Sequence, residues 1–176
     1  MSRPCPASID ADPVLSALWR YWDEKRMARL MPRRRDLDPP LEIPRLLPHL
    51  LLVERAEGRF RWRLAGTAVV EAYGQELTGR FIDEVISAER REAAHRHYAT
   101  VFDTGRPIFV RNRYTSRNAT DFVVSRILLP LAAVDEHNVH LLLQAQTFQL
   151  GSAYAARLGD GFTIDVNLDE IEFLTE

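Results

Sequence analysis

The stretch that decides the fold is RFRWRLAGTAVVEAYGQELTGRFIDEV, residues 59–85. Its first residues alternate between arginine and apolar side chains, which is the period of a β-strand with one wet face. Gly66 permits a sharp exit from this strand, and Thr67 is predicted to cap a short helix over about 68–73. Gly74 stands where a left-handed residue ends a helix. The stretch therefore predicts a strand that leads directly into short helices.

The sequence on either side of this stretch completes a sheet. Residues 49–54 predict a strand that forms a hairpin with 59–65, with Glu57-Gly58 at the turn. A longer amphipathic helix follows Ser87 and ends at Gly105. Three further extended, apolar segments occupy residues 107–116, 122–134 and 139–149. This order predicts an α+β fold in which a five-stranded antiparallel sheet carries the middle helices on one face.

The N-terminal region predicts an amphipathic helix in addition to the sheet. Asp12-Pro13 combines a capping residue with proline at the first helical position, so a helix is expected over about 13–31. Its apolar positions favour either packing on the sheet or a contact between two copies, and as dimer-interface candidates we name Leu15, Leu18, Trp19 and Trp22.

Four regions are expected along the chain. Residues 1–12 are predicted to be disordered, and 13–36 to form the helix and a basic linker. The main domain spans 37–148, and 149–176 is an acidic tail. The tail mixes apolar and acidic residues, a pattern that suits a weak strand or helix, or a docking segment that pairs with the basic helix.

Composition narrows the partners and the compartment. The 176 residues are 46% hydrophobic with a formal net charge of -2, which gives no argument for nucleic acid as a main partner. Cys5 is the single cysteine, so no internal disulfide can form and a reducing compartment is expected. The sequence has no signal-peptide pattern and no apolar run of about 20 residues. We therefore expect a cytoplasmic protein without a membrane partner.

Three segments of the sequence resemble the PAS domain family. They are WRYWDEKR (19–26), LDPPLEIPRLLPHLLLVE (37–54) and FRWRLAGTAVVEAYGQELTGRFIDEV (60–85), within a similarity that covers about residues 14–148. The chain looks specifically like the stand-alone PAS proteins of alphaproteobacteria, formerly classed as a domain of unknown function. In this fold the short helices wall off a hollow over the sheet, which is a natural pocket for a small molecule. The resemblance does not identify a ligand, because PAS proteins share their shape far more than they share a ligand.

No residue pattern predicts catalysis, and the cofactor is unknown. The sequence has no nucleophile elbow, phosphate-binding loop or dinucleotide-binding motif, so an enzyme is not expected. The flavin photochemistry of some PAS proteins needs a cysteine in the helical middle of the domain. Cys5 lies outside the domain, so this photochemistry is not expected. His95 and His97 point in different directions on one helix, and we interpret both as surface residues rather than haem ligands. His137 and His140 match no zinc spacing, so no metal site is predicted.

Residues for a ligand pocket come from the strands and helices that face the expected hollow. The aromatic and aliphatic candidates can equally be core residues, and the polar candidates can equally lie on the outer face of the sheet. The candidates are Trp62, Leu64, Tyr73, Phe81, Phe102, Phe109, Arg111, Phe122, Arg126 and Gln144.

The resemblance implies a non-catalytic sensory or regulatory protein. It would bind an unidentified small molecule or a signalling protein and would act through protein contacts, with a homodimer expected from the N-terminal helix. The alternative is a structural adaptor whose cavity is filled by its own side chains and which acts through that helix or the acidic tail. A haem or flavin redox sensor is a third and more distant hypothesis.

Overall fold

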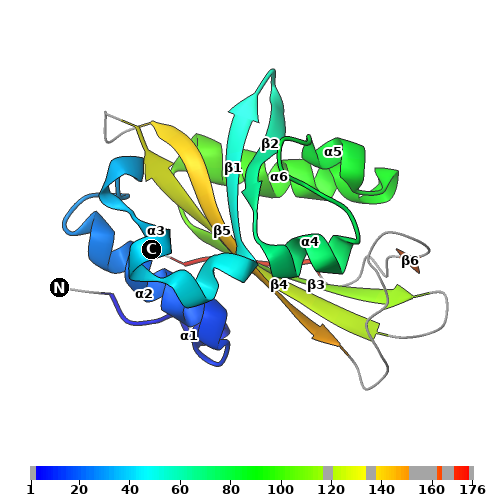
Figure 1. Cartoon of the computed structure of the whole chain (residues 1–176), viewed down its shortest axis with the longest axis horizontal. Coiled ribbons are helices and arrows are strands. Elements are labelled where there is room, and N and C mark those ends of the chain that lie inside the picture. The colour runs from blue at the N-terminus through cyan, green and yellow to red at the C-terminus, as the bar shows by residue number, and fades with distance from the viewer. Residues whose placement is uncertain (1–2, 117–120, 134–137, 151–161, 164–168, 175–176) are drawn as a thin grey trace.

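The computed structural model describes residues 3–116, 121–133, 138–150, 162–163 and 169–174. Helices precede, interrupt and flank a single antiparallel sheet (Figure 1). The helical elements are α1 Ala7–Asp10, α2 Pro13–Arg26, η1 Arg34–Asp36, α3 Pro39–Glu42, η2 Pro44–His49, α4 Thr67–Tyr73, α5 Ile82–Val85 and α6 Ala88–Thr104. The strands are β1 Leu50–Ala56, β2 Arg59–Ala65, β3 Ile108–Ser116, β4 Asp121–Ala132, β5 Val139–Leu150, β6 Phe162–Thr163 and β7 Asp169–Phe173.

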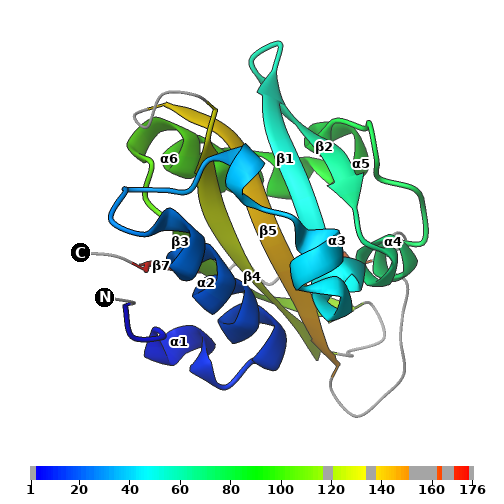
Figure 2. The same ribbon diagram turned by 60° about the vertical axis from the view of Figure 1, so that its left-hand side comes forward.

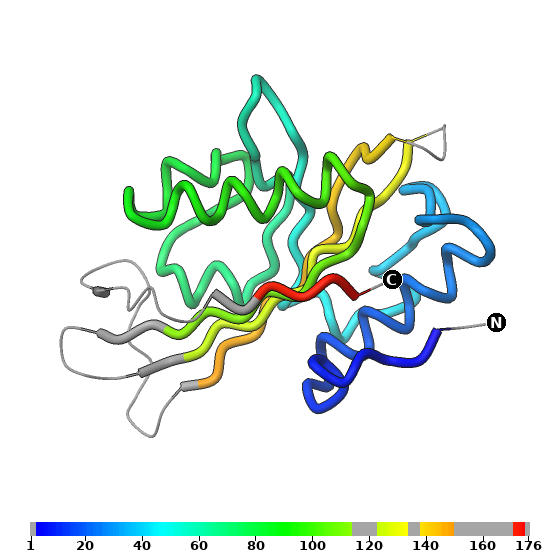
Figure 3. Tube along the Cα trace, turned by 180° about the vertical axis from the view of Figure 1, so that it is seen from behind, coloured from blue at the N-terminus to red at the C-terminus, as the bar shows by residue number. Residues whose placement is uncertain are grey.

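The sheet has the order β2-β1-β5-β4-β3, with β6 and β7 both paired to β3. The five-stranded antiparallel sheet predicted from the sequence is confirmed, and the acidic tail extends it. The tail strand β7 runs antiparallel to β3, with Ile108 opposite Phe173 and Val110 opposite Ile171. Figure 3 shows β7 alongside β3, running toward the side of the molecule that carries α2. The tail is therefore attached to the domain by a strand.

Helices cover both faces of the sheet, and each covered face has its own core. Figure 2 shows α1, α2 and α3 in front of the sheet, with α6 behind it. Alternate residues of one strand enter different cores, since Leu143 packs under α2 whereas Leu142 packs under the middle helices. Ile127 and Leu128 of β4 divide in the same way. The central strands are buried on both sides, which explains their nearly continuous apolar sequence.

The predicted disordered segment, residues 1–12, contains a short helix in the part that the structure describes, residues 3–12. Residues 7–10 form α1, whose Ile9 is fully buried in the α2 core. The backbone N–H of Arg3 also donates to Asp23 of α2 (2.6 Å). The prediction of disorder was wrong for this segment because one apolar side chain and one hydrogen bond attach it to α2.

The N-terminal helix begins as predicted and ends earlier. Both the N–H of Val14 and that of Leu15 donate to the Asp12 carboxylate, which caps α2. The helix ends at Arg26 because Met27 has a positive φ of 54°. The buried Arg26 guanidinium donates to the carbonyls of Met27 and Arg29, which satisfies acceptors beyond the last turn.

Gly66 has a different role from the one predicted. It is the N-cap residue of α4, and Thr67 is the first helical residue rather than the cap. Gly66 has an ordinary φ of -71°, so backbone freedom is not the reason for glycine. A Cβ at this position would lie 2.3 Å from the Leu47 carbonyl oxygen and 2.4 Å from that of Pro48. Glycine is needed here because η2 passes directly against the strand end.

Within the described ranges, no helix is both long and apolar enough to cross a membrane.

Candidate functional site

A cleft of about 280 Å³ opens between the start of β2, α5 and α6. Its walls combine apolar side chains with a charged rim. The apolar residues are Phe60, Ile82, Ile86, Ala94 and Tyr98, and the rim carries Arg59, Asp83, Arg91, Glu92 and His95. Such a surface suits a small molecule with an apolar body and a few polar groups, and the volume lies just below the usual range for ligand sites.

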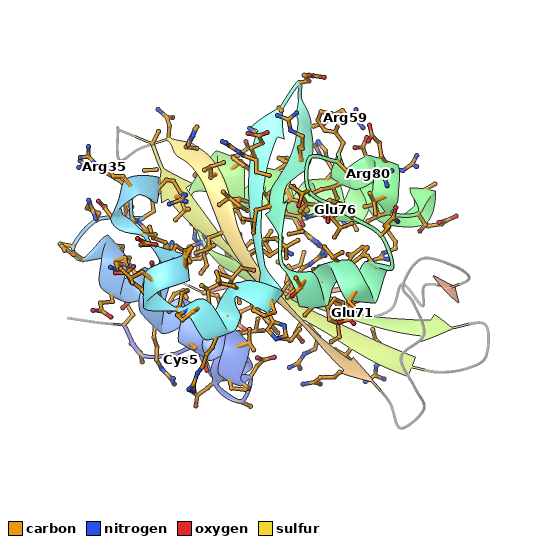
Figure 4. All side chains as sticks on the ribbon, in the orientation of Figure 1. Cys5, Arg35, Arg59, Glu71, Glu76 and Arg80 are labelled. Carbon is orange, nitrogen blue, oxygen red and sulfur yellow. The ribbon has the colours of Figure 1, made fainter. Side chains whose placement is uncertain are left out.

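One arginine fixes the position of α5 at the rim of the cleft. Arg59 donates from Nε and Nη2 to Asp83, at 3.0 and 2.8 Å, and from Nη2 to Glu84 at 2.9 Å. These hydrogen bonds lower the pKa of Asp83, and they raise that of Arg59. The guanidinium also lies 3.9 Å from the ring centre of Phe81. Figure 4 shows Arg59 at the upper end of β2, near α5. The rim is thus held by a half-exposed ion pair.

The floor of the cleft leads into a buried polar chain. Tyr98 is 1% exposed, and its hydroxyl donates to Oε1 of Gln144 on β5 (2.9 Å). Nε2 of Gln144 then donates to Oε1 of Gln146 (3.1 Å). We call Tyr98, Gln144 and Gln146 the glutamine seam. Burial raises the pKa of Tyr98 to about 12, so the hydroxyl remains a hydrogen-bond donor at neutral pH.

The glutamine seam ends on a donor without an acceptor in the described part of the chain. Gln146 is 2% exposed, and its Nε2 has no hydrogen-bond partner there. Buried polar groups are nearly always satisfied, so an unsatisfied amide is a natural contact for a ligand acceptor. The seam can therefore change its hydrogen bonding when an additional acceptor enters.

A buried arginine lies next to the seam. Arg126 on β4 is opposite Gln146 in the sheet register, and its Nη2 contacts Nδ1 of His97 and donates to Oδ1 of Asn112, each at 3.1 Å. Burial, and then the positive charge of Arg126, lower the pKa of His97 to about 3. His97 is thus neutral at pH 7, and its Nδ1 accepts the hydrogen bond from Arg126. The interpretation of both histidines as surface residues was wrong for His97, which is 1% exposed, and right for the exposed His95.

The pKa of His97 predicts a pH dependence of stability. The unfolded chain protonates this group near pH 6.5, whereas the folded chain resists protonation down to about pH 3. The stabilising contribution is therefore complete above pH 6.5 and is lost as the pH falls toward 3. We expect His97→Asn to remove this component, so its free energy of unfolding should fall less steeply than that of the wild type.

Urea unfolding at several pH values between about 7 and 4 measures this effect. His95→Asn, an exposed position on the same helix, is the matched control and should follow the wild-type profile. Parallel pH profiles for the wild type and His97→Asn would contradict the assignment.

The structure brings together five of the ten predicted pocket residues on the sheet face covered by α4–α6. Trp62 and Tyr73 are buried and pack edge to face, with ring centres 6.0 Å apart. Phe102 is partly buried, and its ring stacks on Phe60. Arg126 and Gln144 carry the buried polar contacts described above. None of the five lines the cleft itself.

Four of the predicted pocket residues lie elsewhere. Phe109 is buried under α2 on the opposite face, and Arg111, two residues on, is exposed with its guanidinium over the Phe109 ring. Phe81 lies half-buried beneath arginine side chains. Leu64 is 49% exposed, because the register between β1 and β2 shifts at Leu52 and places it opposite Leu52. Phe122 belongs to β4, but its side chain lies outside the described residues.

The register shift between β1 and β2 is a β-bulge, and it changes the predicted face of one β2 residue. Strict alternation predicts Phe60, Trp62 and Leu64 on one face, but an extra residue in β2 turns Leu64 away from the other two.

The four dimer-interface candidates are core residues of the chain itself. Leu15, Leu18, Trp19 and Trp22 are each 0% exposed and pack against the sheet. The two indoles stack with ring centres 5.6 Å apart, and Nε1 of Trp22 donates to the Pro130 carbonyl (2.9 Å). These residues cannot form a contact between copies while α2 stays on the sheet, so this assignment was wrong.

Several residues of the site were missed by the sequence reasoning. Gln146 and Asn112 lie two positions from Gln144 and Val110 on their strands, so alternation could have placed them on the same face. The cleft residues Ile82 and Ile86 come from the short α5 segment, whose packing has no periodic signal, and Arg91 lies near the start of α6. Among the described residues, no group of three or more metal-ligating side chains occurs.

The fold and the site together define an α+β domain. Short helices lie over one face of an antiparallel sheet, with a cleft at their edge and a buried polar chain next to it. A model of the PAS domain family matches residues 11–144. The chain therefore belongs to the PAS domain family, which indicates a sensory or regulatory role, and PAS domains are typically non-catalytic.

Solved structures similar to the chain include a LOV protein and a light-oxygen-voltage domain. The LOV protein of Rhodobacter sphaeroides is 18% identical, with a TM-score of 0.46. The match covers 62% of this chain and 62% of that one, so the chain spans about three fifths of its length. A light-oxygen-voltage domain studied with a flavin analogue is 15% identical, with a TM-score of 0.43 and coverage of 64% of this chain and 84% of that one. A comparison with curated proteins gives no match.

Proposed function

We propose that this PAS protein is a non-catalytic sensor in which the cleft and the glutamine seam bind a small molecule. The observation that carries the proposal is the hydrogen-bonded connection between them. Tyr98 lines the cleft and also donates to Gln144 at 2.9 Å. A ligand that displaces the Tyr98 ring leaves a buried glutamine oxygen to find another donor, which costs about 1–3 kcal/mol if it finds none. Occupancy of the cleft is thereby linked to the hydrogen bonding of β5.

The other face of β5 connects the sensor to the N-terminal helix. Thr147 follows Gln146, and its hydroxyl donates to Oδ2 of Asp12 (2.6 Å). Oδ1 of the same carboxylate accepts the N–H groups of Val14 and Leu15 at the start of α2. Gln146 is thus adjacent to the residue that holds the N-cap of α2. We propose that ligand binding, by changing the hydrogen bonds of Gln146, shifts the population of α2 positions.

The proposed output is a contact with another protein. PAS family membership supports this regulatory role. A homodimer in the cytoplasm is part of the proposal, with a contact surface other than the buried face of α2. No cofactor is assigned, because the described site offers neither a cysteine nor a metal-ligating cluster to select one.

A structural adaptor remains the second candidate, and the packing of the covered face supports it. Large side chains of the protein itself fill much of the space under α4–α6, including Trp62, Tyr73, Tyr98 and Val101, which are all at least nine-tenths buried. An adaptor would not change its stability with any small molecule, whereas a sensor would.

Thermal unfolding against a panel of small metabolites separates the two functions. A ligand at 100 times its Kd should stabilise the sensor by about 2.7 kcal/mol. Ala94→Phe places a ring in the cleft and should abolish this gain, whereas Ala88→Phe, an exposed position at the start of α6, should retain it. Stabilisation that is equal in both variants would contradict binding in the cleft.

A further inference from the structure

A second cavity, of about 110 Å³, lies on the opposite face of the sheet from the cleft. It is lined by the segment from η1 to η2 and by strands β1, β2, β4 and β5. We call it the leucine groove. Apart from prolines and one arginine its lining is leucine, including Leu37, Leu47, Leu52, Leu64, Leu131 and Leu143. None of its lining side chains is acidic or aromatic.

The bulge in β2 contributes an exposed leucine to this groove. The register shift at Leu52 brings Leu64 opposite it, on the groove side of the sheet. Leu64 is 49% exposed although it lies in a strand, whereas the neighbouring Leu131 and Leu143 are almost fully buried. Leu64 thus extends the apolar lining from the buried floor to the surface.

The one charged residue of the lining is a cation. Arg34 is exposed, and its Nη1 donates to the carbonyl of Leu37, itself a lining residue, at 3.0 Å. This hydrogen bond holds the guanidinium at the mouth of the groove. The next residue, Arg35, is also exposed and makes the potential there more positive. The groove and the cleft share no lining residue, and Figure 4 shows Arg35 well away from Arg59 of the cleft rim.

Aliphatic walls with an arginine at the mouth select one chemical class. A leucine-lined cavity offers no hydrogen-bonding side chain to a polar ring, and it contacts an alkyl chain favourably. An arginine at the end of such a cavity pairs with a carboxylate. The volume is below that of a site for a whole drug-sized ligand, so it fits part of a chain, with the rest of the chain on Leu64.

We propose that the leucine groove binds a free aliphatic carboxylate, a medium-chain fatty acid, with its chain against the leucines and its carboxylate at Arg34. This site is independent of the proposed function of the cleft. The proposal rests on charge complementarity and on an apolar lining that the protein leaves partly uncovered.

Calorimetric titration of the full-length protein with decanoate, below the concentration at which it forms micelles, tests the proposal. The wild type should bind saturably. Leu64→Glu places a carboxylate in the lining and should weaken binding by about tenfold or more. Leu41→Glu is the matched control, because Leu41 is 79% exposed and does not line the groove, and it should bind like the wild type. Leu64→Thr provides a second variant of the same position, with a weaker effect in the same direction.

The role of Arg34 has its own test. Arg34→Gln should weaken decanoate binding by about tenfold while leaving the binding of 1-decanol, which has the same chain without the charge, unchanged. Arg35→Gln should leave both nearly unchanged, since Arg35 does not line the groove.

Three results would overturn the proposal. They are the absence of saturable decanoate binding by the wild type, equal effects of the substitutions at Leu64 and Leu41, and binding confined to vesicles of anionic phospholipid. The Ala94→Phe variant should retain decanoate binding, which keeps a failure of the groove distinct from a failure of the cleft.

Discussion

Replacing Trp22 by alanine should reduce the free energy of unfolding by about 4 kcal/mol, a large part of the 5–15 kcal/mol expected for a domain. The indole is 0% exposed, stacks on Trp19 and donates to the Pro130 carbonyl on β4. The substitution therefore creates a cavity between α2 and the sheet and leaves a buried acceptor without its donor. Urea unfolding of the purified variant measures the loss.

Two further variants make the Trp22 result specific. Trp22→Phe keeps a ring and loses the N–H donor, so it should lose only about 1–2 kcal/mol. Met27→Ala, at a 75% exposed position just after α2, should change stability by no more than about 0.5 kcal/mol. If Trp22→Ala kept its stability and only converted a dimer to monomers, the indole would be an interface residue, and the packing of α2 on the sheet would be contradicted.

Replacing Gly66 by alanine should destabilise the protein by about 3 kcal/mol or more. The added Cβ would lie 2.3 Å from the Leu47 carbonyl oxygen and 2.4 Å from that of Pro48, both of which are backbone atoms. Neither atom can rotate away as a flexible side chain would. Relief requires η2 to move away from α4, and η2 leads directly into β1. Thermal and urea unfolding measure the expected loss.

Gly58→Ala is the matched control for Gly66. Gly58 has a φ of +73° in the β1–β2 turn, and no atom lies within 4 Å of a Cβ built there. Its replacement should therefore introduce only left-handed backbone strain, about 1–2 kcal/mol. A loss at Gly66 no larger than the loss at Gly58 would show that η2 does not press on this glycine.

The parts of the fold that follow from local sequence could be predicted. The turn at Glu57-Gly58 and the glycine ends of α4 and α6 were placed correctly, because positive φ angles have a residue signature. The bulge that turns Leu64 had no such signature, because it depends on how β2 pairs with β1. The early end of α2 likewise depends on a buried arginine that reaches two carbonyls beyond it.

Only part of the candidate site could be predicted, because the pattern along a strand does not tell which face of the sheet carries the pocket. Alternation in β3, β4 and β5 tells which residues share a face, but both faces of this sheet are buried. Phe109 was therefore assigned to the pocket although it packs under α2, whereas the sequence left the face of Arg126 and Gln144 open and the structure places both under the middle helices. The cleft itself depends on where Arg59 holds α5, a tertiary contact that no local pattern reports.

Native mass spectrometry of the freshly purified protein, exposed to a metabolite extract of its host cells, tests whether the cleft binds a small molecule. We expect the wild type and Ala88→Phe to carry an added mass that disappears on denaturation, and Ala94→Phe to carry none. The same spectra give the oligomeric state. An added mass that is equally present in Ala94→Phe, or absent from all three proteins across the accessible extract concentrations, would contradict a small-molecule sensor with its site in this cleft.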